Sequence, residues 1–181
     1  LLVFSPDSPT KAASRSAFHS AGQRCSALRV LFLQNEIADA TMKLLAGAMQ
    51  ELLVGLPTRL STDVGPVIDE QALAGLQAHV QRMERDHRLI ASTPVPAGLD
   101  GHYIAPCAFE IDSIGVLEKE VFGPILHVVR YRSRDLDRII GIGGRGREGQ
   151  FHTFIDGLVA DRGKDRSGVY LSYRDCDGLA I

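Results

Sequence analysis

The sequence predicts an α/β domain with a mostly parallel open sheet that helices cover. Short apolar segments such as 28–34 and 125–131, each bounded by polar residues, are typical of buried strands. Segments with apolar residues at helical spacing lie between them, and strands that alternate with helices favour a parallel sheet. The 181 residues, 45% hydrophobic and 23% charged, suit a single globular domain with enough chain to bury a core.

The individual elements follow from periodicity and from helix and turn signals. The predicted helices cover residues 10–20, 36–54, 69–86 and 135–140. The predicted strands cover residues 1–4, 28–34, 88–91, 103–111 with a break at Pro106, 125–131 and 169–173. Gly22 ends the first of these helices, Gly55 and Pro57 end the second, and Asp69 caps the third.

Charge and cysteine content exclude several classes of function. The net charge of −2 predicts no basic face, so a nucleic-acid partner is not expected. No apolar run is long enough to span a bilayer, and residues 1–20 lack the pattern of a signal peptide. Three widely spaced cysteines fit neither a disulfide framework nor a zinc site, so we expect no metal and a cytoplasmic location. Leu1, in place of Met, suggests a piece of a longer chain.

The composition of the sequence changes after Ile140. Residues 141–150, GIGGRGREGQ, contain five glycines and three charged residues. Within this segment, residues 141–146 formally match the dinucleotide fingerprint G-x-G-x-x-G, which needs a strand before it and a helix after it. A helix-like segment precedes the match and a poor helix start follows it. A flexible linker or a degraded segment is therefore the favoured interpretation.

Cys25 is the residue whose chemistry most needs an explanation. A thiol attacks a carbonyl carbon only as the thiolate, so a nucleophilic cysteine needs positive potential and access. Arg24 is adjacent, and a helix end at Gly22 would leave backbone N–H groups near Cys25 that can hold an oxyanion. Cysteine is also among the most often buried residue types, so chemistry alone favours a packing role for Cys25.

Four motifs resemble those of the aldehyde dehydrogenase superfamily, and this resemblance favours a catalytic role for Cys25 over a packing role. They are GQRC at residues 22–25, DVGPVI at 63–68, GHYIAP at 101–106 and EVFGP at 120–124. These segments resemble the family's G-Q-x-C, G-P-[LIV]-I, G-x-[FY]-[IV]-x-P and E-x-F-G-P motifs, in the same order. The resemblance covers about residues 16–135 and looks nearest to the glutamate-semialdehyde (1-pyrroline-5-carboxylate) dehydrogenase half of bifunctional proline-utilisation enzymes.

The resemblance implies a role for three residues. Cys25 would be the nucleophile, forming a thiohemiacetal with a small aldehyde, passing hydride to NAD and leaving a thioester for water to hydrolyse. Its own N–H would form half of the oxyanion hole. Glu120 would hydrogen-bond the nicotinamide ribose, and Phe122 would pack beside the nicotinamide. Without the motif, Glu120 is more simply a solvated carboxylate and Phe122 ordinary core. We expect Cys25 and Glu120 to meet in a cleft at the carboxyl edge of the sheet.

The resemblance also implies parts of the family that this sequence does not show. The nucleotide-binding domain, the oxyanion asparagine and the general-base glutamate are expected upstream of Leu1. Downstream, Tyr173 stands where the family has an asparagine, and the segment that anchors the substrate carboxylate does not appear. The resemblance therefore describes residues 1–140 as a truncated, partial aldehyde dehydrogenase catalytic domain. Residues 141–181 are then a degraded or divergent continuation of it.

Two hypotheses for the function follow. The first is an NAD-dependent aldehyde dehydrogenase of proline catabolism that oxidises L-glutamate 5-semialdehyde to glutamate, with the isolated chain inactive or weakly active because the general base is missing. The alternative is a non-catalytic remnant or an interaction module of the same origin. In both cases an exposed domain interface favours association, including a homo-oligomer.

Overall fold

The computed structural model of the chain describes residues 7–135 and 169–170. The predicted strand over 1–4, the predicted helix over 135–140 apart from its first residue, and the glycine-rich segment 141–150 lie outside the described residues. The division of the chain at Ile140 therefore stays a prediction.

The described part of the chain contains both helices and strands, interspersed along the sequence. The helices are α1 (Asp7–Phe18), α2 (Asn35–Gln50) and α3 (Glu70–Asp86), and short 3-10 turns lie at His19–Gly22, Ile114–Val116 and Ser133–Asp135. The strands are β1 (Val30–Gln34), β2 (Arg88–Ser92), β3 (Cys107–Ile111), β4 (Ile125–Tyr131) and β5 (Val169–Tyr170). These elements confirm the predicted α/β fold class.

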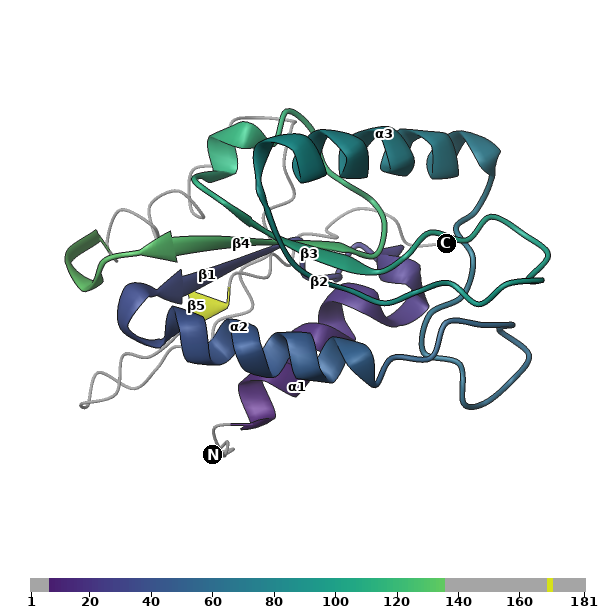
Figure 1. The fold of residues 1–181 in the computed structure, drawn as a ribbon, viewed down its shortest axis with the longest axis horizontal. Helices are drawn as coiled ribbons and strands as arrows, with labels where there is room; N and C mark the ends of the chain where they lie inside the picture. Colours follow the sequence, from purple (N-terminus) through teal and green to yellow (C-terminus); the bar gives the residue numbers. More distant parts are fainter. Residues whose placement is uncertain (1–6, 136–168, 171–181) are drawn as a thin grey trace, which may run out of the picture.

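The strands form one open sheet in the order β2-β3-β4-β1-β5. The two central pairs, β3 with β4 and β4 with β1, are parallel, as predicted. The two edge strands run antiparallel to their neighbours. The crossover from β1 to β4 contains α2 and α3, and these helices cover opposite faces of the sheet, with α1 on the same side as α2 (Figure 1).

The core lies between the sheet and both helical layers. Four consecutive residues of β1, Val30 to Leu33, are buried, as expected for a strand that is covered on both faces. The largest fully buried side chains include Phe18, Phe32, Met49, Met83 and Phe109, which come from all three helices and two of the strands.

The end of α2 differs from the prediction. We expected the helix to continue to residue 54, but it ends at Gln50. Long-range backbone contacts replace the last helical turn: the Leu53 N–H donates to an Asp63 carboxylate oxygen at 2.9 Å, and the Leu53 carbonyl accepts from the N–H groups of Asp63 and Val64. Leu53, expected on the buried face of the helix, is consequently 55% exposed.

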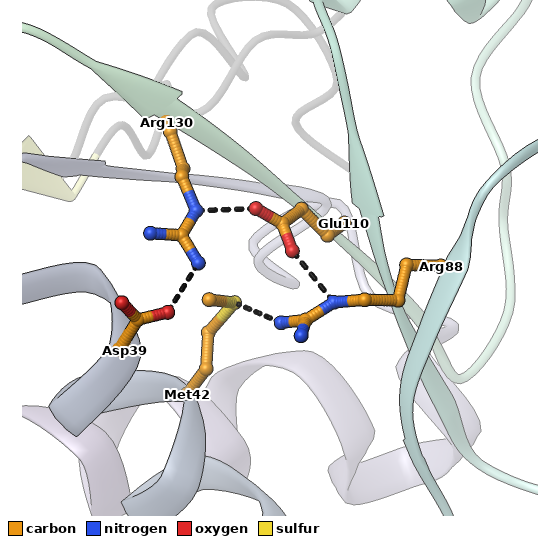
Figure 2. Close-up of polar contacts among 5 residues, drawn as sticks. All are labelled: Asp39, Met42, Arg88, Glu110 and Arg130. Atoms are coloured by element: carbon orange, nitrogen blue, oxygen red, sulfur yellow. Dashed lines mark hydrogen bonds and ion pairs between the residues drawn. The ribbon is translucent and has the colours of Figure 1, made fainter. Parts of the chain in front are cut away.

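A network of ion pairs ties β2, β3, β4 and α2 together away from the predicted site (Figure 2). The Glu110 carboxylate lies between two arginines on the neighbouring strands, with Arg88 Nε at 2.8 Å from one oxygen and Arg130 Nε bonded to the other. Arg130 also donates to Asp39, and Arg88 contacts the Met42 sulfur at 3.6 Å. One side chain in β3 thus contacts both neighbouring strands, and its two partners extend the network to α2.

Candidate functional site

The segment that carries Cys25 turns sharply just before β1. Ser20, Ala21 and Gly22 have φ values of 57°, 52° and 61°, a run of left-handed residues that turns the chain away from α1. The Ala27 N–H then donates to the Arg24 carbonyl at 3.0 Å, which closes a turn around Cys25. As a result, the Cys25 side chain is exposed.

The second described cysteine has the opposite environment. Cys107, at the start of β3, is 2% exposed and belongs to the hydrophobic core, as its apolar surroundings in the sequence indicate. Burial, with a smaller contribution from the negative charge of Glu84, raises the pKa of its thiol to about 12. Cys107 therefore stays protonated at neutral pH, and of the two described cysteines only Cys25 meets the requirement of access.

Gly22 brings the cysteine segment into direct contact with the segment 120–124. A Cβ on Gly22 would lie 2.2 Å from the carbonyl oxygen of Gly123, closer than atoms pack. A Cβ on Gly123 would in turn lie 2.5 Å from the side chain of Leu76 on α3. The G-Q-R-C and E-V-F-G-P motifs therefore meet backbone to backbone, because two glycines leave room for the approach.

Gln23 joins the cysteine segment to the loop 65–68. Its side-chain nitrogen donates to the Pro66 carbonyl at 3.2 Å, and its side-chain oxygen accepts from the Ile68 N–H at 2.9 Å. The Val67 N–H, between these two, donates to the His102 carbonyl at 2.8 Å. Three of the four motifs are thus connected by hydrogen bonds to backbone groups.

Arg29, the last residue before β1, connects the three predicted site residues. Its guanidinium donates from Nη1 to the Gly22 carbonyl, from Nη2 to the Arg24 carbonyl at 3.1 Å, and from Nε to Glu120 at 3.4 Å. The same group lies over the Phe122 ring, 4.6 Å from its centroid. The cysteine segment and both predicted cofactor-facing residues therefore surround one guanidinium.

The charge of Arg29 is balanced within the site. Its side chain is 7% exposed, and this burial lowers the pKa of the guanidinium from its usual value. The negative charge of Glu120 opposes that change and raises the pKa, as does, to a smaller extent, the charge of Cys25. The guanidinium stays positive at neutral pH. It supplies the positive potential next to Cys25 that the sequence suggested for Arg24, which is exposed.

A cavity of about 370 Å³ opens between α3 and the segment 119–122. Its polar lining residues are Gln23, Asp69, Gln71, His79, Lys119 and Glu120, and Phe122 contributes an aromatic ring that is 45% exposed. This volume lies at the lower end of the range for small-molecule sites. The cavity thus holds both predicted cofactor-facing residues.

Two histidines link this cavity to Arg29, the residue before β1. His127 Nδ1 lies 3.1 Å from the Arg29 carbonyl, and its Nε2 lies 2.9 Å from His79 Nε2. Arg82 Nη2 lies 3.2 Å from the remaining ring nitrogen of His79. Because a carbonyl only accepts and a guanidinium only donates, the protons are assigned to His127 Nδ1 and His79 Nε2. Both rings are then neutral and fully paired.

The position of the site in the sheet differs from the prediction. We expected Cys25 and Glu120 at the carboxyl edge of the sheet. In the structure, Cys25 precedes β1, and Glu120 and Phe122 precede β4. The strands β1 and β4 are parallel, so their amino ends lie at the same edge. The site therefore lies at their amino edge. The rule for open α/β sheets concerns loops that follow strands, whereas here the motifs lie on segments that lead into strands.

Two residues of the site were not found from the sequence. Arg29 precedes an apolar strand, where a charged residue usually marks the exposed end, and only its burial reveals its role. His79 lies on α3 at a position that helical periodicity leaves unassigned.

The described residues contain neither a membrane-spanning helix nor a group of side chains placed to bind a metal ion. No helix there is long and apolar enough to cross a membrane. No group of three or more His, Cys, Asp or Glu side chains in those ranges is placed to hold a metal ion.

Comparison with known proteins defines the class of protein. The model of the aldehyde dehydrogenase family matches residues 6–142. This chain belongs to the aldehyde dehydrogenase family, as the four motifs indicated.

Its relatives include bifunctional proline-utilisation proteins. Bifunctional protein PutA of Escherichia coli (strain K12) is 47% identical over 154 residues, which cover 80% of this chain and 12% of that protein. Bifunctional protein PutA of Rhizobium meliloti is 39% identical over 150 residues, with the same shares. The chain thus spans about an eighth of the length of these curated relatives.

Solved structures agree with this assignment. A point variant of proline utilization A from Bradyrhizobium japonicum matches with a TM-score of 0.69 and 48% identity, covering 74% of this chain and 13% of that chain. A gamma-glutamyl-gamma-aminobutyraldehyde dehydrogenase from Burkholderia cenocepacia matches with a TM-score of 0.68 and 26% identity, covering 75% and 28%.

Proposed function

We propose that this chain carries the nucleophile and part of the cofactor-facing surface of an NAD-dependent aldehyde dehydrogenase that oxidises L-glutamate 5-semialdehyde to glutamate. The observation that carries the proposal is the meeting of two motifs in one place. An exposed cysteine lies on a segment that packs, through Gly22 and Gly123, against the segment of Glu120 and Phe122.

Cys25 has the access that a nucleophile requires. As the thiolate, its sulfur attacks the aldehyde carbon, and the carbonyl electron pair moves to the oxygen, which gives a thiohemiacetal oxyanion. The buried positive charge of Arg29 interacts electrostatically with Cys25 and would stabilise the oxyanion that forms in this step. Loss of hydride from that carbon leaves a thioester on Cys25, which water hydrolyses.

The cavity that Gln23, Glu120 and Phe122 line has groups that suit one half of a nicotinamide dinucleotide. The Glu120 carboxylate accepts hydrogen bonds, as sugar hydroxyls require, and it is held in place by Arg29 at 3.4 Å. The half-exposed Phe122 ring offers a flat apolar surface for a planar heterocycle. NAD, when bound, supplies the hydride acceptor.

The substrate class rests on the relatives. The longer stretches 16–34 and 120–132 resemble enzymes that act on glutamate semialdehyde, and curated relatives at 39% to 47% identity are bifunctional PutA proteins. We propose that the 181-residue chain forms the covalent adduct with the aldehyde through Cys25.

The proposal is tested by the reactivity of Cys25. The chain is treated with iodoacetamide at pH 7, and labelling is assigned to each cysteine by peptide mass spectrometry. We expect Cys25 to react faster than glutathione, and added L-glutamate 5-semialdehyde to slow this reaction reversibly. Cys107 is the internal control, because its buried thiol should not be labelled while the protein is folded.

A different result would support the alternative. If Cys25 of the folded chain reacts no faster than glutathione and the aldehyde gives no protection, the chain is better described as a non-catalytic module of aldehyde dehydrogenase origin. Circular dichroism on the same sample verifies that the chain is folded.

A further inference from the structure

We infer that Arg29 is a positioning residue that holds the Cys25 segment and the Glu120–Phe122 segment in one fixed arrangement. This inference rests on the proposed function, because it concerns how the nucleophile and the cofactor-facing residues keep their relative positions. Arg29 is not placed among the reacting groups, and it acts through the residues that it holds.

The contacts of Arg29 use three different nitrogens for three different partners. Nη1 and Nη2 donate to the carbonyls of Gly22 and Arg24, on either side of Gln23, and Nε donates to Glu120. A guanidinium is planar, so these three directions are fixed relative to one another. Fixing the two carbonyls orients the peptide units that lead to Cys25, whose N–H is the proposed oxyanion donor.

The aromatic contact adds a fourth constraint. The guanidinium carbon lies 4.6 Å from the centroid of the Phe122 ring, within the range of a cation–π interaction. Phe122 is 45% exposed and therefore has little packing to fix its orientation. The face of the guanidinium limits the positions of this ring, while its edge holds Glu120 and the cysteine segment.

The cost of burying this charge supports a specific use for it. Arg29 is 6% exposed, and an apolar side chain of similar size would fill the same space without losing hydration. An apolar residue, however, would leave the Gly22 and Arg24 carbonyls and the Glu120 carboxylate without this donor. Lysine has one donor nitrogen in place of three and could satisfy only part of this set.

The test compares Cys25 reactivity in four forms of the 181-residue chain: the wild type, Arg29→Met, Arg29→Lys and the control Arg130→Met. Arg130 is the matched control, because it also pairs with a glutamate but does so in the network around Glu110. The alkylation rate of Cys25 at pH 7 is measured with iodoacetamide and assigned by peptide mass spectrometry. Thermal unfolding of each variant is recorded in parallel.

We expect Arg29→Met to slow Cys25 alkylation about five- to tenfold, because the variant removes both a buried cation and the donors that fix the Gly22 and Arg24 carbonyls. Arg29→Lys should restore part of the rate, to within about two- to threefold of the wild type, because it keeps the charge but not the three directions. Arg130→Met should leave the rate unchanged even if it lowers the unfolding temperature.

A further variant, Glu120→Gln, tests whether Arg29 connects the two segments. Glu120→Gln should change the Cys25 rate in the wild type, where Arg29 transmits the change, and should have no effect when added to Arg29→Met. Equal effects of Glu120→Gln in both backgrounds would contradict the inference, since a purely structural Arg29 would give additive changes.

The outcomes separate the inference from the proposed function. A wild-type Cys25 that reacts no faster than glutathione contradicts the proposed function. A reactive wild-type Cys25 whose rate is unchanged or increased in folded Arg29→Met overturns the inference alone. If Arg29→Met does not fold, Arg29→Lys tests the inference in its place. A full wild-type alkylation rate in Arg29→Lys overturns the inference that Cys25 depends on the three donor nitrogens of Arg29.

Discussion

The carbonyl oxygen of Gly123 occupies the space that a Cβ on Gly22 would need, at 2.2 Å from that position. This contact joins the segment of the predicted nucleophile to the segment of the predicted cofactor-facing residues, although 101 positions separate the two glycines. Gly22 also has a φ of +61°, which an L side chain adopts only at a cost.

Gly22→Ala should therefore destabilise the fold more than its backbone conformation alone explains. We expect a loss of about 3 kcal/mol or more in the free energy of unfolding, measured by urea denaturation, because the two segments must separate. Gly98→Ala is the matched control: it has a φ of +80° with nothing within 4 Å, so about 1 kcal/mol is expected there. Equal losses for the two variants would rule out a role for the Gly22–Gly123 contact.

Gln23→Ala should loosen the loop 65–68. The substitution removes the donor to the Pro66 carbonyl and the acceptor for the Ile68 N–H, for a cost of about 1–2 kcal/mol. Amide hydrogen exchange should speed up at Ile68 while the Val67 amide, bonded to His102, stays protected. Gln71→Ala, at an exposed position of α3, should change neither amide, and unaltered exchange at Ile68 in Gln23→Ala would contradict the connection.

The histidine pair should make the stability depend on pH. Burial lowers the pKa of His127 to about 3 and that of His79 to about 4, both below the usual value near 6.5. At pH values between the lowered pKa of each histidine and 6.5, the unfolded chain binds more protons than the folded chain. The free energy of unfolding therefore falls as the pH falls below about 6.5. The slope is at most about 1.4 kcal/mol per pH unit for each histidine.

Thermal unfolding between pH 7.5 and pH 4.5 measures this dependence. The double variant His79→Leu/His127→Leu should reduce the slope, because neither ring remains to be protonated on unfolding. His102→Gln should keep it, since the pair is intact in that variant. A slope that survives in the double variant would show that other groups cause the loss of stability.

Glu110→Gln should weaken the network shown in Figure 2. The amide cannot satisfy two arginines with charged hydrogen bonds, and Arg130 and Arg88 on neighbouring strands then repel each other. We expect a loss of about 1–3 kcal/mol in the free energy of unfolding, because Glu110 is 20% exposed. Asp86→Asn, which breaks an exposed pair with Arg85, should leave stability unchanged by the same urea measurement.

The sequence predicted the fold well where local chemistry decides it. Asp69 caps α3 as expected, its side chain accepting from the Ala72 N–H at 2.7 Å. The apolar runs became β1 and β4 in the centre of the sheet. The predicted end of α2 was wrong, because contacts between Leu53 and the loop at Asp63, ten positions further along, replace its last turn. Helical periodicity does not indicate such a partner.

The site was only partly visible in the sequence. The motifs identified Cys25, Glu120 and Phe122, and their roles remain proposals. Arg29 could not be found by pattern, because its proposed role depends on contact with Glu120, 91 positions further along the chain. The prediction that the site lies at the carboxyl edge of the sheet was wrong, because the general rule describes loops after strands, whereas these motifs precede β1 and β4.

The pairing of β1 with β4 sets the geometry of everything ahead of them. Val30 lies opposite His127, and one step earlier the His127 N–H donates to the Arg29 carbonyl at 3.0 Å. A slip of one residue between these strands would carry the thiol about 3.3 Å past Glu120 and turn the guanidinium to the opposite face of the sheet. The alignment of two hydrophobic strands thus sets the distances within the polar candidate site that lies ahead of them.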